Sequence, residues 1–218
     1  MTIEEVKSNN PDIAVIHVND SGFKAFGKVL KKDLNTYVEY MEKNIPIPGQ
    51  GVDYAAEDTG LMTLEKERHY LETEVYGQMP VEVGFCAGHN QIMDGMEWHY
   101  GCEVNVAVTD LVLFLAEYSS LEHSEDGKVH LNSRQVKAVY VPKGYAIALN
   151  PLVLHFTPIE VQKEGFSTVV ALPAHTNEAL LEATADPYLK ARNSWIIYHK
   201  DTGRGSENDG INLKLKYK

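Results

Sequence analysis

The feature that most constrains this fold is a succession of short apolar segments between residues 81 and 172. They are rich in β-branched and aromatic residues, which favour strands, and polar or turn-forming residues separate them. Such a succession predicts an antiparallel sandwich or barrel of about seven or more strands. The predicted strands are 81–85, 103–108, 111–115, 136–141, 145–149, 153–161 and 166–172.

The residues before this core carry weaker strand and helix signals. Residues 14–18 predict a short strand, and apolar residues at helical spacing after Asp33, a potential cap, predict a helix that ends near Asn44. Two prolines follow, and each lacks an amide donor and restricts the residue before it. We therefore expect residues 45–60 to form an ordered loop.

The residues after the core predict a mixed C-terminal segment. Residues 177–192 have a helical apolar pattern interrupted by Pro187, and residues 194–199 predict a final strand. Residues 211–216 alternate as an edge strand does, and this strand can pair within the domain or with a second subunit.

A chain of 218 residues can bury a full core as one domain. The apolar content of residues 1–60 is too thin to form a core alone, so we expect the flanks to pack onto the barrel. The predicted domain comprises an N-terminal extension (1–80), a barrel core (81–175) and a C-terminal helix, strand and tail (176–218).

Charge and composition exclude several classes of partner. Lys and Arg number 20 against 31 Asp and Glu, and a net charge of −11 repels nucleic acid and anionic membrane surfaces. We find no apolar run long enough to span a bilayer and no signal peptide, so we expect a cytoplasmic protein. Cys86 and Cys102 form no CxxC pair and are expected to be buried thiols.

The densest group of potential metal ligands contains Glu97, His99 and Glu103. On a helix, residues two apart point about 200° apart, whereas on a strand they share a face. The apolar residues after Glu103 favour the strand, and Gly101 can form a turn or bulge that brings Glu103 to the same side. The three side chains are therefore expected to converge.

A second histidine, His155, lies in the apolar run 153–156. A charged imidazole there needs a partner, which is either a backbone carbonyl or a metal ion. Two carboxylates and an imidazole that face an apolar interior would repel one another or remain as uncompensated buried charges without a cation. This favours the metal. We predict that Glu97, His99, Glu103 and His155 bind a metal ion.

These residues resemble the two motifs of the cupin superfamily. The spacing Glu97-x-His99-x3-Glu103 matches the first motif, with glutamate in place of its first histidine, and residues 142–144 match the Pro-x-Gly of the second. His155 follows later than usual, as in cupin sugar isomerases such as the D-lyxose isomerase group. The resemblance implies a mainly β, cupin-type antiparallel barrel, a double-stranded β-helix.

A closer resemblance, to a family of uncharacterised bacterial cupin-like proteins of about this length, covers most of the chain. It implies the fold but no established reaction. The segments that carry it are 84–90, 97–99, 103–107, 154–158, 176–177 and 193–199.

Two carboxylates and two imidazoles form a mixed oxygen and nitrogen shell. Such a shell suits Mn²⁺, Fe²⁺, Ni²⁺ or Zn²⁺, and we expect Mn²⁺ or Zn²⁺ as the cofactor. With a divalent ion the site is about neutral, and open coordination positions would admit substrate oxygens.

Three residues are candidates for proton transfer. Glu103 is the first candidate base, because a carboxylate near a cation can exchange between ligation and proton transfer, and Glu97 and His89 follow. His89 in Gly88-His89-Asn90 is equally well explained as a turn cap. Trp98 should face away from the metal.

We expect a metal-dependent isomerase or epimerase of a sugar or sugar phosphate, acting by proton transfer through a metal-bound enediolate. The alternatives are a cupin lyase or aminohydrolase on a small ureido or carboxylate substrate, and a non-catalytic sugar-binding module. The negative charge favours neutral sugars unless Lys143, Arg134 or Arg68 forms a basic patch. The cupin resemblance leaves a homodimer open.

Overall fold

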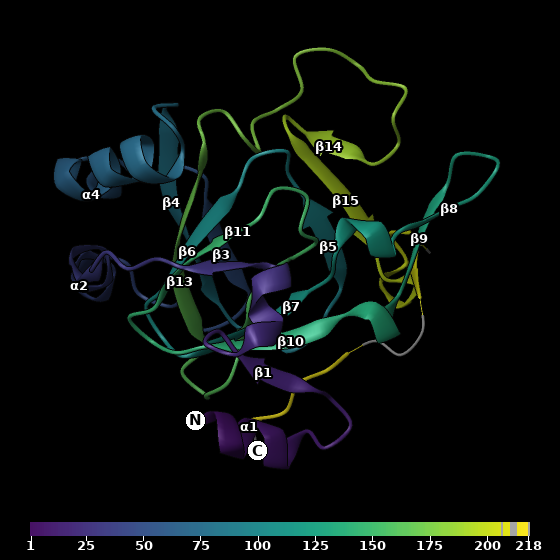
Figure 1. Cartoon of the computed structure of the whole chain (residues 1–218), viewed down its shortest axis with the longest axis horizontal. Helices are drawn as coiled ribbons and strands as arrows, with labels where there is room; N and C mark the ends of the chain where they lie inside the picture. Colours follow the sequence, from purple (N-terminus) through teal and green to yellow (C-terminus); the bar gives the residue numbers. More distant parts are fainter. Residues whose placement is uncertain (206, 210–212, 218) are drawn as a thin grey trace.

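Two β-sheets face each other at the centre of the computed structural model (Figure 1), which describes residues 1–205, 207–209 and 213–217. The larger sheet has the order β2-β11-β6-β13-β4-β3, and the smaller has the order β1-β10-β7-β12. The larger sheet comprises β2 (Gly27–Val29), β11 (Ala146–Leu149), β6 (Glu103–Ala107), β13 (Phe166–Pro173), β4 (Val81–Gly88) and β3 (Val52–Ala55). The smaller comprises β1 (Val15–His17), β10 (Lys137–Val141), β7 (Leu111–Leu115) and β12 (Ile159–Glu160).

Two three-stranded sheets and several short helices complete the described structure. The first sheet comprises β14 (Leu189–Ala191), β15 (Ser194–Tyr198) and β5 (Gly95–Trp98), and the second β16 (Asn208–Asp209), β9 (Val129–Asn132) and β8 (Glu122–His123). The α-helices are α1 (Ile3–Asn9), α2 (Asn35–Asn44), α3 (Thr59–Met62) and α4 (Glu65–Tyr70), which continues into a π-helical turn (Leu71–Val75). Short 3₁₀ turns are formed by Ser21–Ala25, Tyr118–Ser120, Ser133–Gln135 and Lys200–Thr202.

The strand order is that of a double-sheet jelly roll. On one side β4, β13, β6 and β11 are neighbours, and on the other side residues 153–160 lie between β5 and β7, with β10 beyond. Strands from the two halves of the chain therefore alternate across both sheets, as in two interlocked Greek keys, the architecture of cupins. This topology confirms the predicted mainly β, cupin-type antiparallel barrel.

Side-chain alternation explains why the core strands are apolar on both faces. In β7, Leu111, Leu113 and Leu115 belong to the interior cluster, whereas Val112 and Phe114 belong to a cluster on the outer face. Successive strand residues point to opposite faces. Because both faces of β7 are covered, the segment reads as a continuous apolar run and not as an alternating one.

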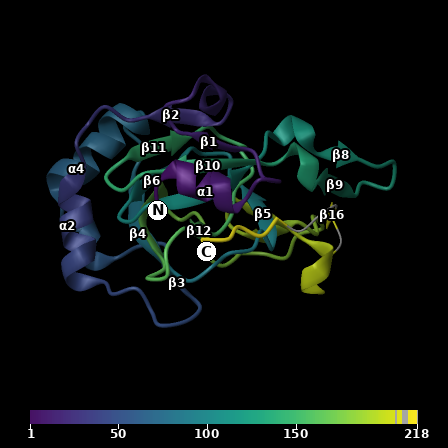
Figure 2. The ribbon, with the colours of Figure 1, turned by 90° about the horizontal axis from the view of Figure 1, so that it is seen from below.

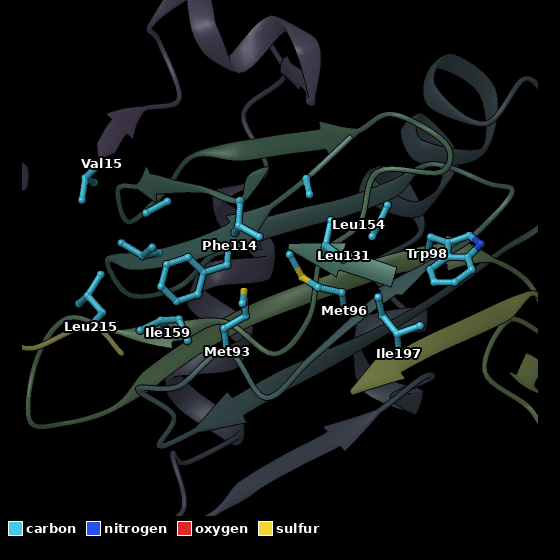
Figure 3. Packing of buried hydrophobic residues seen from close by; sticks show 14 of the residues in the cluster. Val15, Met93, Met96, Trp98, Phe114, Leu131, Leu154, Ile159, Ile197 and Leu215 are labelled. Carbon is cyan, nitrogen blue, oxygen red and sulfur yellow. The ribbon is translucent and has the colours of Figure 1, made fainter. Parts of the chain in front are cut away.

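Different elements cover the two outer faces. Figures 1 and 2 show α2 and α4 along one side of the molecule, where Tyr37 and Met41 of α2 pack in one cluster with Val104 and Val106 of β6. Figure 3 shows the other cluster, in which Phe114 lies among residues from distant parts of the chain. The helices thus leave the inward-facing residues of β6 free to form a site.

Residues 1–80 contribute strands to both sheets. The strand β1 pairs in parallel with β10, and β2 and β3 pair antiparallel with β11 and β4. The predicted helix ends at Asn44 as expected, but the prediction of a loop over residues 45–60 is wrong, since it contains β3 and the start of α3. Gly84 permits this pairing, because a Cβ there would lie 1.8 Å from the Ala55 carbonyl oxygen.

The predicted helix at 177–192 is also wrong, since the structure has turns and bends there before the strand β14. The Asp186 amide donates to the Thr184 hydroxyl, and the Tyr188 amide donates to the Asp186 carboxylate. Such local side-chain bonds compete with helical ones. Asn177 has a φ of 66°, which also breaks a helix at its start.

The ends of the described chain lie close together (Figure 2), and the Asn10 side chain exchanges hydrogen bonds with the Lys216 backbone. The predicted edge strand at 211–216 falls partly outside the described residues; within them, Lys214 forms a bridge with Ile92. None of the helices in the described chain has the length and apolar character that crossing a membrane requires.

Glu82 provides a test of this packing. Its buried carboxylate accepts a hydrogen bond from the His175 amide at 2.7 Å, whereas its Oε1 has no partner among the described residues. Burial raises the pKa of Glu82 to about 7; the His175 amide opposes this increase, and Glu178 and Glu57 add to it. Between pH 4.5 and 7 the folded state therefore binds more protons than the unfolded chain, and stability falls as pH rises.

We expect Glu82→Gln to raise the melting temperature at pH 8, where the parent buries a charge, and to change it little at pH 5. Thermal unfolding followed by circular dichroism at both pH values measures this difference. The exposed Glu125→Gln serves as the control for a change in net charge. An equal effect of Glu82→Gln at both pH values would contradict the assignment.

Candidate metal centre

Glu97 and His155 face each other across an antiparallel bridge. The Glu97 amide donates to the His155 carbonyl at 2.6 Å, and the His155 amide donates to the Glu97 carbonyl at 2.9 Å. Residues paired in this way point their side chains to the same face of a sheet. The neighbours Met96 and Trp98 belong to the outer cluster, so Glu97 points inward.

Glu103 starts β6 and enters the interior by the same alternation. Val104 and Val106 pack under the helices, so Glu103 and Asn105 share the opposite face. The Asn105 side-chain amide donates to Glu103 Oε1 at 2.8 Å. This bond fixes the orientation of the carboxylate and leaves Oε2 directed at the histidines.

Both histidines are oriented by backbone carbonyls. Nδ1 of His99 lies 2.8 Å from the Asn193 carbonyl oxygen, and Nδ1 of His155 lies 2.8 Å from the Val153 carbonyl oxygen. A carbonyl only accepts, so Nδ1 carries the proton, and Nε2 of the neutral ring presents a lone pair. Metal-binding histidines are commonly oriented in this way.

The ligand atoms lie at separations that suit a shared ion. Glu103 Oε2 is 3.0 Å from His155 Nε2 and 3.6 Å from His99 Nε2, and Glu97 Oε2 is 4.0 Å from His99 Nε2. Two ligands about 2.1 Å from one ion at a right angle lie about 3 Å apart. Glu97, His99 and His155 form a group whose ligand atoms all lie within 4.8 Å, and Glu103 adjoins it through both histidines.

Glu103 and His155 stabilise each other's charged forms. Burial disfavours the ionised form of Glu103, but His155 and His99 outweigh it and lower the carboxyl pKa. Burial likewise opposes the charged form of His155, but the Glu103 carboxylate raises the imidazole pKa to about 9. A proton on His155 thus balances Glu103 when no ion is bound, and a divalent ion would replace it.

His99 presents a buried ring nitrogen that can accept a ligand bond. Its side chain is 1 % exposed, and its Nε2 has no hydrogen-bond partner among the described residues. A buried imidazole nitrogen without a partner costs free energy. The donor set of two imidazoles and two carboxylates fits a divalent transition metal.

A cavity of about 270 Å³ opens beside the cluster. Glu97, Glu103 and His155 line it, and its other lining side chains are uncharged. These are Val52, Tyr54, Cys86, Asn105, Phe156, Thr157, Pro158, Val170, Asn177, Ala191, Ser194 and Ile196. A small molecule in this cavity would contact the ligand cluster.

The remaining site candidate, His89, lies elsewhere. Its Nδ1 is 2.6 Å from Glu160 Oε2, and Gln91 donates to the other oxygen of that carboxylate at 2.9 Å. His89 is absent from the described residues that line the cavity. Trp98 lines a different groove with Trp195, in agreement with its expected direction away from the ligands.

Three polar lining residues were not singled out from the sequence as site residues. Tyr54 comes from β3, which the prolines before it disguised as a loop, and Asn177 comes from the turn after β13. Ser194 starts β15 and donates to Glu97 Oε2 at 3.4 Å. Asn177 and Ser194 lie within the segments that carry the closer family resemblance, and that was the one signal available for them.

The topology and the ligand cluster define a cupin-type barrel with a candidate metal centre. The chain belongs to the family described as domain of unknown function DUF4867, which matches residues 15–215. None of the curated proteins matches the sequence.

Several solved structures share weak similarity with this chain. Hazelnut vicilin is 10 % identical over 55 % of this chain and 27 % of its own, with a TM-score of 0.29. The Mn(II)-containing oxalate decarboxylase of Bacillus subtilis is 9 % identical over 81 % of this chain and 41 % of its own, with a TM-score of 0.35. The polyketide cyclase RemF of Streptomyces resistomycificus is 12 % identical over 66 % of this chain and 82 % of its own, with a TM-score of 0.22.

The chain thus spans less than half the length of vicilin and of the decarboxylase.

We expect His99→Ala and His155→Ala to lose most of the bound ion while the barrel stays folded, since each removes one ligand. Metal content after gel filtration and the far-ultraviolet circular dichroism spectrum measure the two effects. Adding the ion should also raise the melting temperature of the parent and not of the variants. His123→Ala, on the exposed strand β8, is the matched control, and full occupancy in both site variants would contradict the assignment.

Proposed function

We propose that Glu97, His99, Glu103 and His155 hold a divalent ion, Mn²⁺ or Zn²⁺, with Fe²⁺ and Ni²⁺ as further ions that suit the same donors. The observation that supports this most directly is the pair of oriented Nε2 atoms that face the Glu103 carboxylate. Sulfur does not contribute to the donor set, so Cu(I) is disfavoured.

We further propose that the protein is an isomerase or epimerase of a sugar or sugar phosphate. His155 follows the Pro-x-Gly of residues 142–144 at a longer spacing than in most cupins. This spacing resembles that of cupin sugar isomerases such as the D-lyxose isomerase group, and the resemblance supports the proposal. A bound divalent ion would supply the positive charge that polarises a substrate carbonyl and a neighbouring hydroxyl. The cavity beside the ligands has room for a small polyhydroxy compound.

Glu103 is the proposed base that moves a proton between neighbouring carbons. The Asn105 side chain donates to its Oε1, and its Oε2 lies close to Nε2 of both histidines. Glu103 also lines the cavity. The lowered pKa keeps this carboxyl ionised at neutral pH, which is the protonation state that a base requires. Glu97, which is more exposed than Glu103 and also lines the cavity, is the second candidate.

His89 fits this role less directly than the two glutamates. Its pairing with Glu160 gives it a partner outside the cavity. If it contributes, it does so through the segment that joins β4 to β5 and not by contact with a substrate at the ligand cluster.

In deuterium oxide, the metal-loaded protein should place deuterium on the carbon beside the carbonyl of its substrate. Glu103→Gln should slow this exchange at least about a hundredfold, because general base catalysis contributes about 10²–10⁴-fold. Proton nuclear magnetic resonance of aldoses, ketoses and their phosphates measures the exchange. Glu160→Gln, which removes the partner of His89, should leave the rate within about threefold of the parent.

Metal content is measured for both variants, so that loss of the ion is not mistaken for loss of the base. Tight sugar binding with every carbon-bound proton retained would instead favour a sugar-binding module. Ammonia release or cleavage of a ureido acid would favour the lyase or aminohydrolase.

A further inference from the structure

We propose that the cavity accepts an uncharged polyhydroxy substrate, an unphosphorylated monosaccharide, and that the Tyr54 hydroxyl donates a hydrogen bond to it. This inference rests on the proposed function, because it specifies the substrate of the same site. It is carried by the charges that surround the cavity and by the hydrogen bond between Tyr54 and Asn177.

The described lining of the cavity lacks the lysine or arginine side chains that commonly bind a phosphate ester. Its acidic and imidazole lining groups are Glu97, Glu103 and His155, and neither lysine nor arginine occurs among the described residues that line it. Protein sites for phosphate usually present arginine, lysine or a cluster of backbone amides. With a divalent ion bound, the two carboxylates already balance its charge, so a phosphate dianion would be left uncompensated.

The basic residues considered from the sequence lie elsewhere. Arg68 pairs with Glu72 at 2.9 Å, and Lys143 pairs with Glu42. Arg134 lines a separate groove formed by residues near the N-terminus and β10. None of the three lines the cavity beside the ligand cluster.

Two basic residues flank the cavity wall without facing it. Lys190 and Arg192 lie on either side of Ala191, which lines the cavity, but neither is among the described residues that line it. Lys190 donates to the Pro187 carbonyl at 2.6 Å, and Arg192 lies 2.5 Å from Glu178 Oε2. Both cations thus have partners outside the cavity.

The polar groups of the wall suit hydroxyl groups. The Asn177 side-chain amide donates to the Tyr54 oxygen at 2.9 Å, so the phenolic proton is free to point elsewhere. A tyrosine hydroxyl stays protonated at neutral pH and can donate to a substrate oxygen. Asn105, Thr157 and Ser194 add uncharged groups that can donate and accept.

The volume of the cavity also favours a monosaccharide. Its volume of about 270 Å³ lies just below the range of roughly 300–1,000 Å³ for pockets that hold drug-sized ligands. A monosaccharide is the class of sugar that such a volume favours over a longer saccharide.

The test uses the full chain loaded with Mn²⁺ and compares free aldoses and ketoses with their phosphate esters. Binding is measured through water-proton relaxation by the ion, which needs no turnover, and exchange is measured in deuterium oxide. We expect the best free sugar to bind at least about tenfold more tightly than its phosphate ester. Tighter binding of the phosphate ester would overturn the inference.

Variants at the cavity mouth sharpen this comparison. Val52, which lines the cavity on β3, is replaced by Lys or by Met as the matched uncharged control. Val52→Lys should improve phosphate ester binding relative to free sugar by about threefold or more, and Val52→Met should not. Arg192→Gln should leave both ligands within about twofold; selective loss of phosphate ester binding there would contradict the inference.

Tyr54→Phe tests the hydroxyl itself. It should weaken free sugar binding about three- to tenfold, the cost of one hydrogen bond, with metal content unchanged. Unaltered sugar binding would overturn the role assigned to Tyr54.

The outcomes separate this inference from the proposed function. If free sugars bind but none exchanges deuterium, the isomerase proposal fails and the inference stands. If a phosphate ester binds more tightly and exchanges, the isomerase proposal stands and the inference fails. Absence of binding by either kind of ligand contradicts both.

Discussion

The buried carboxylate of Glu103 is the group on which the rest of the site depends. It lies at the base of the interior with two imidazole Nε2 atoms as its nearest charged or chargeable partners, at 3.0 and 3.6 Å. Burial alone would drive it to the neutral acid, so the surrounding structure has to supply positive charge. A proton on His155 supplies it in the free protein, and a divalent ion can supply it with the donors already in place.

The jelly roll makes this arrangement compatible with a packed core. Alternation along β6 places Val104 and Val106 under the helices and Glu103 and Asn105 inside, so one strand serves stability on one face and the site on the other. The strand β5 repeats this division, with Glu97 inward and Trp98 outward. The polar side chains thus occupy inward-facing positions, and their strand neighbours pack in the outer apolar clusters.

The sequence predicted what depends on local periodicity and spacing. The apolar barrel strands were predicted because burial on both faces leaves apolar runs, and α2 was predicted because apolar residues recur at helical spacing after Asp33. The candidate ligands were recognised because Glu97, His99 and Glu103 can share one side of a strand and a turn. Pairing between strands that are distant in the sequence leaves no comparable periodicity or spacing. β3 depends on the close approach of the Ala55 carbonyl to Gly84, and the irregular course of residues 184–188 depends on hydrogen bonds from backbone amides to local side chains. Tyr54 therefore escaped notice, although it lines the cavity.

The carbonyl of Asn193 that orients His99 belongs to the segment after the barrel core, although all four candidate ligands lie within residues 81–175. The identity of the donors and the direction in which one of them points are therefore encoded in different parts of the chain. Grafting the barrel residues alone onto another jelly roll would transfer the donors without the atom that sets the His99 tautomer. A transplantable form of this centre has to include β15 and the turn that precedes it.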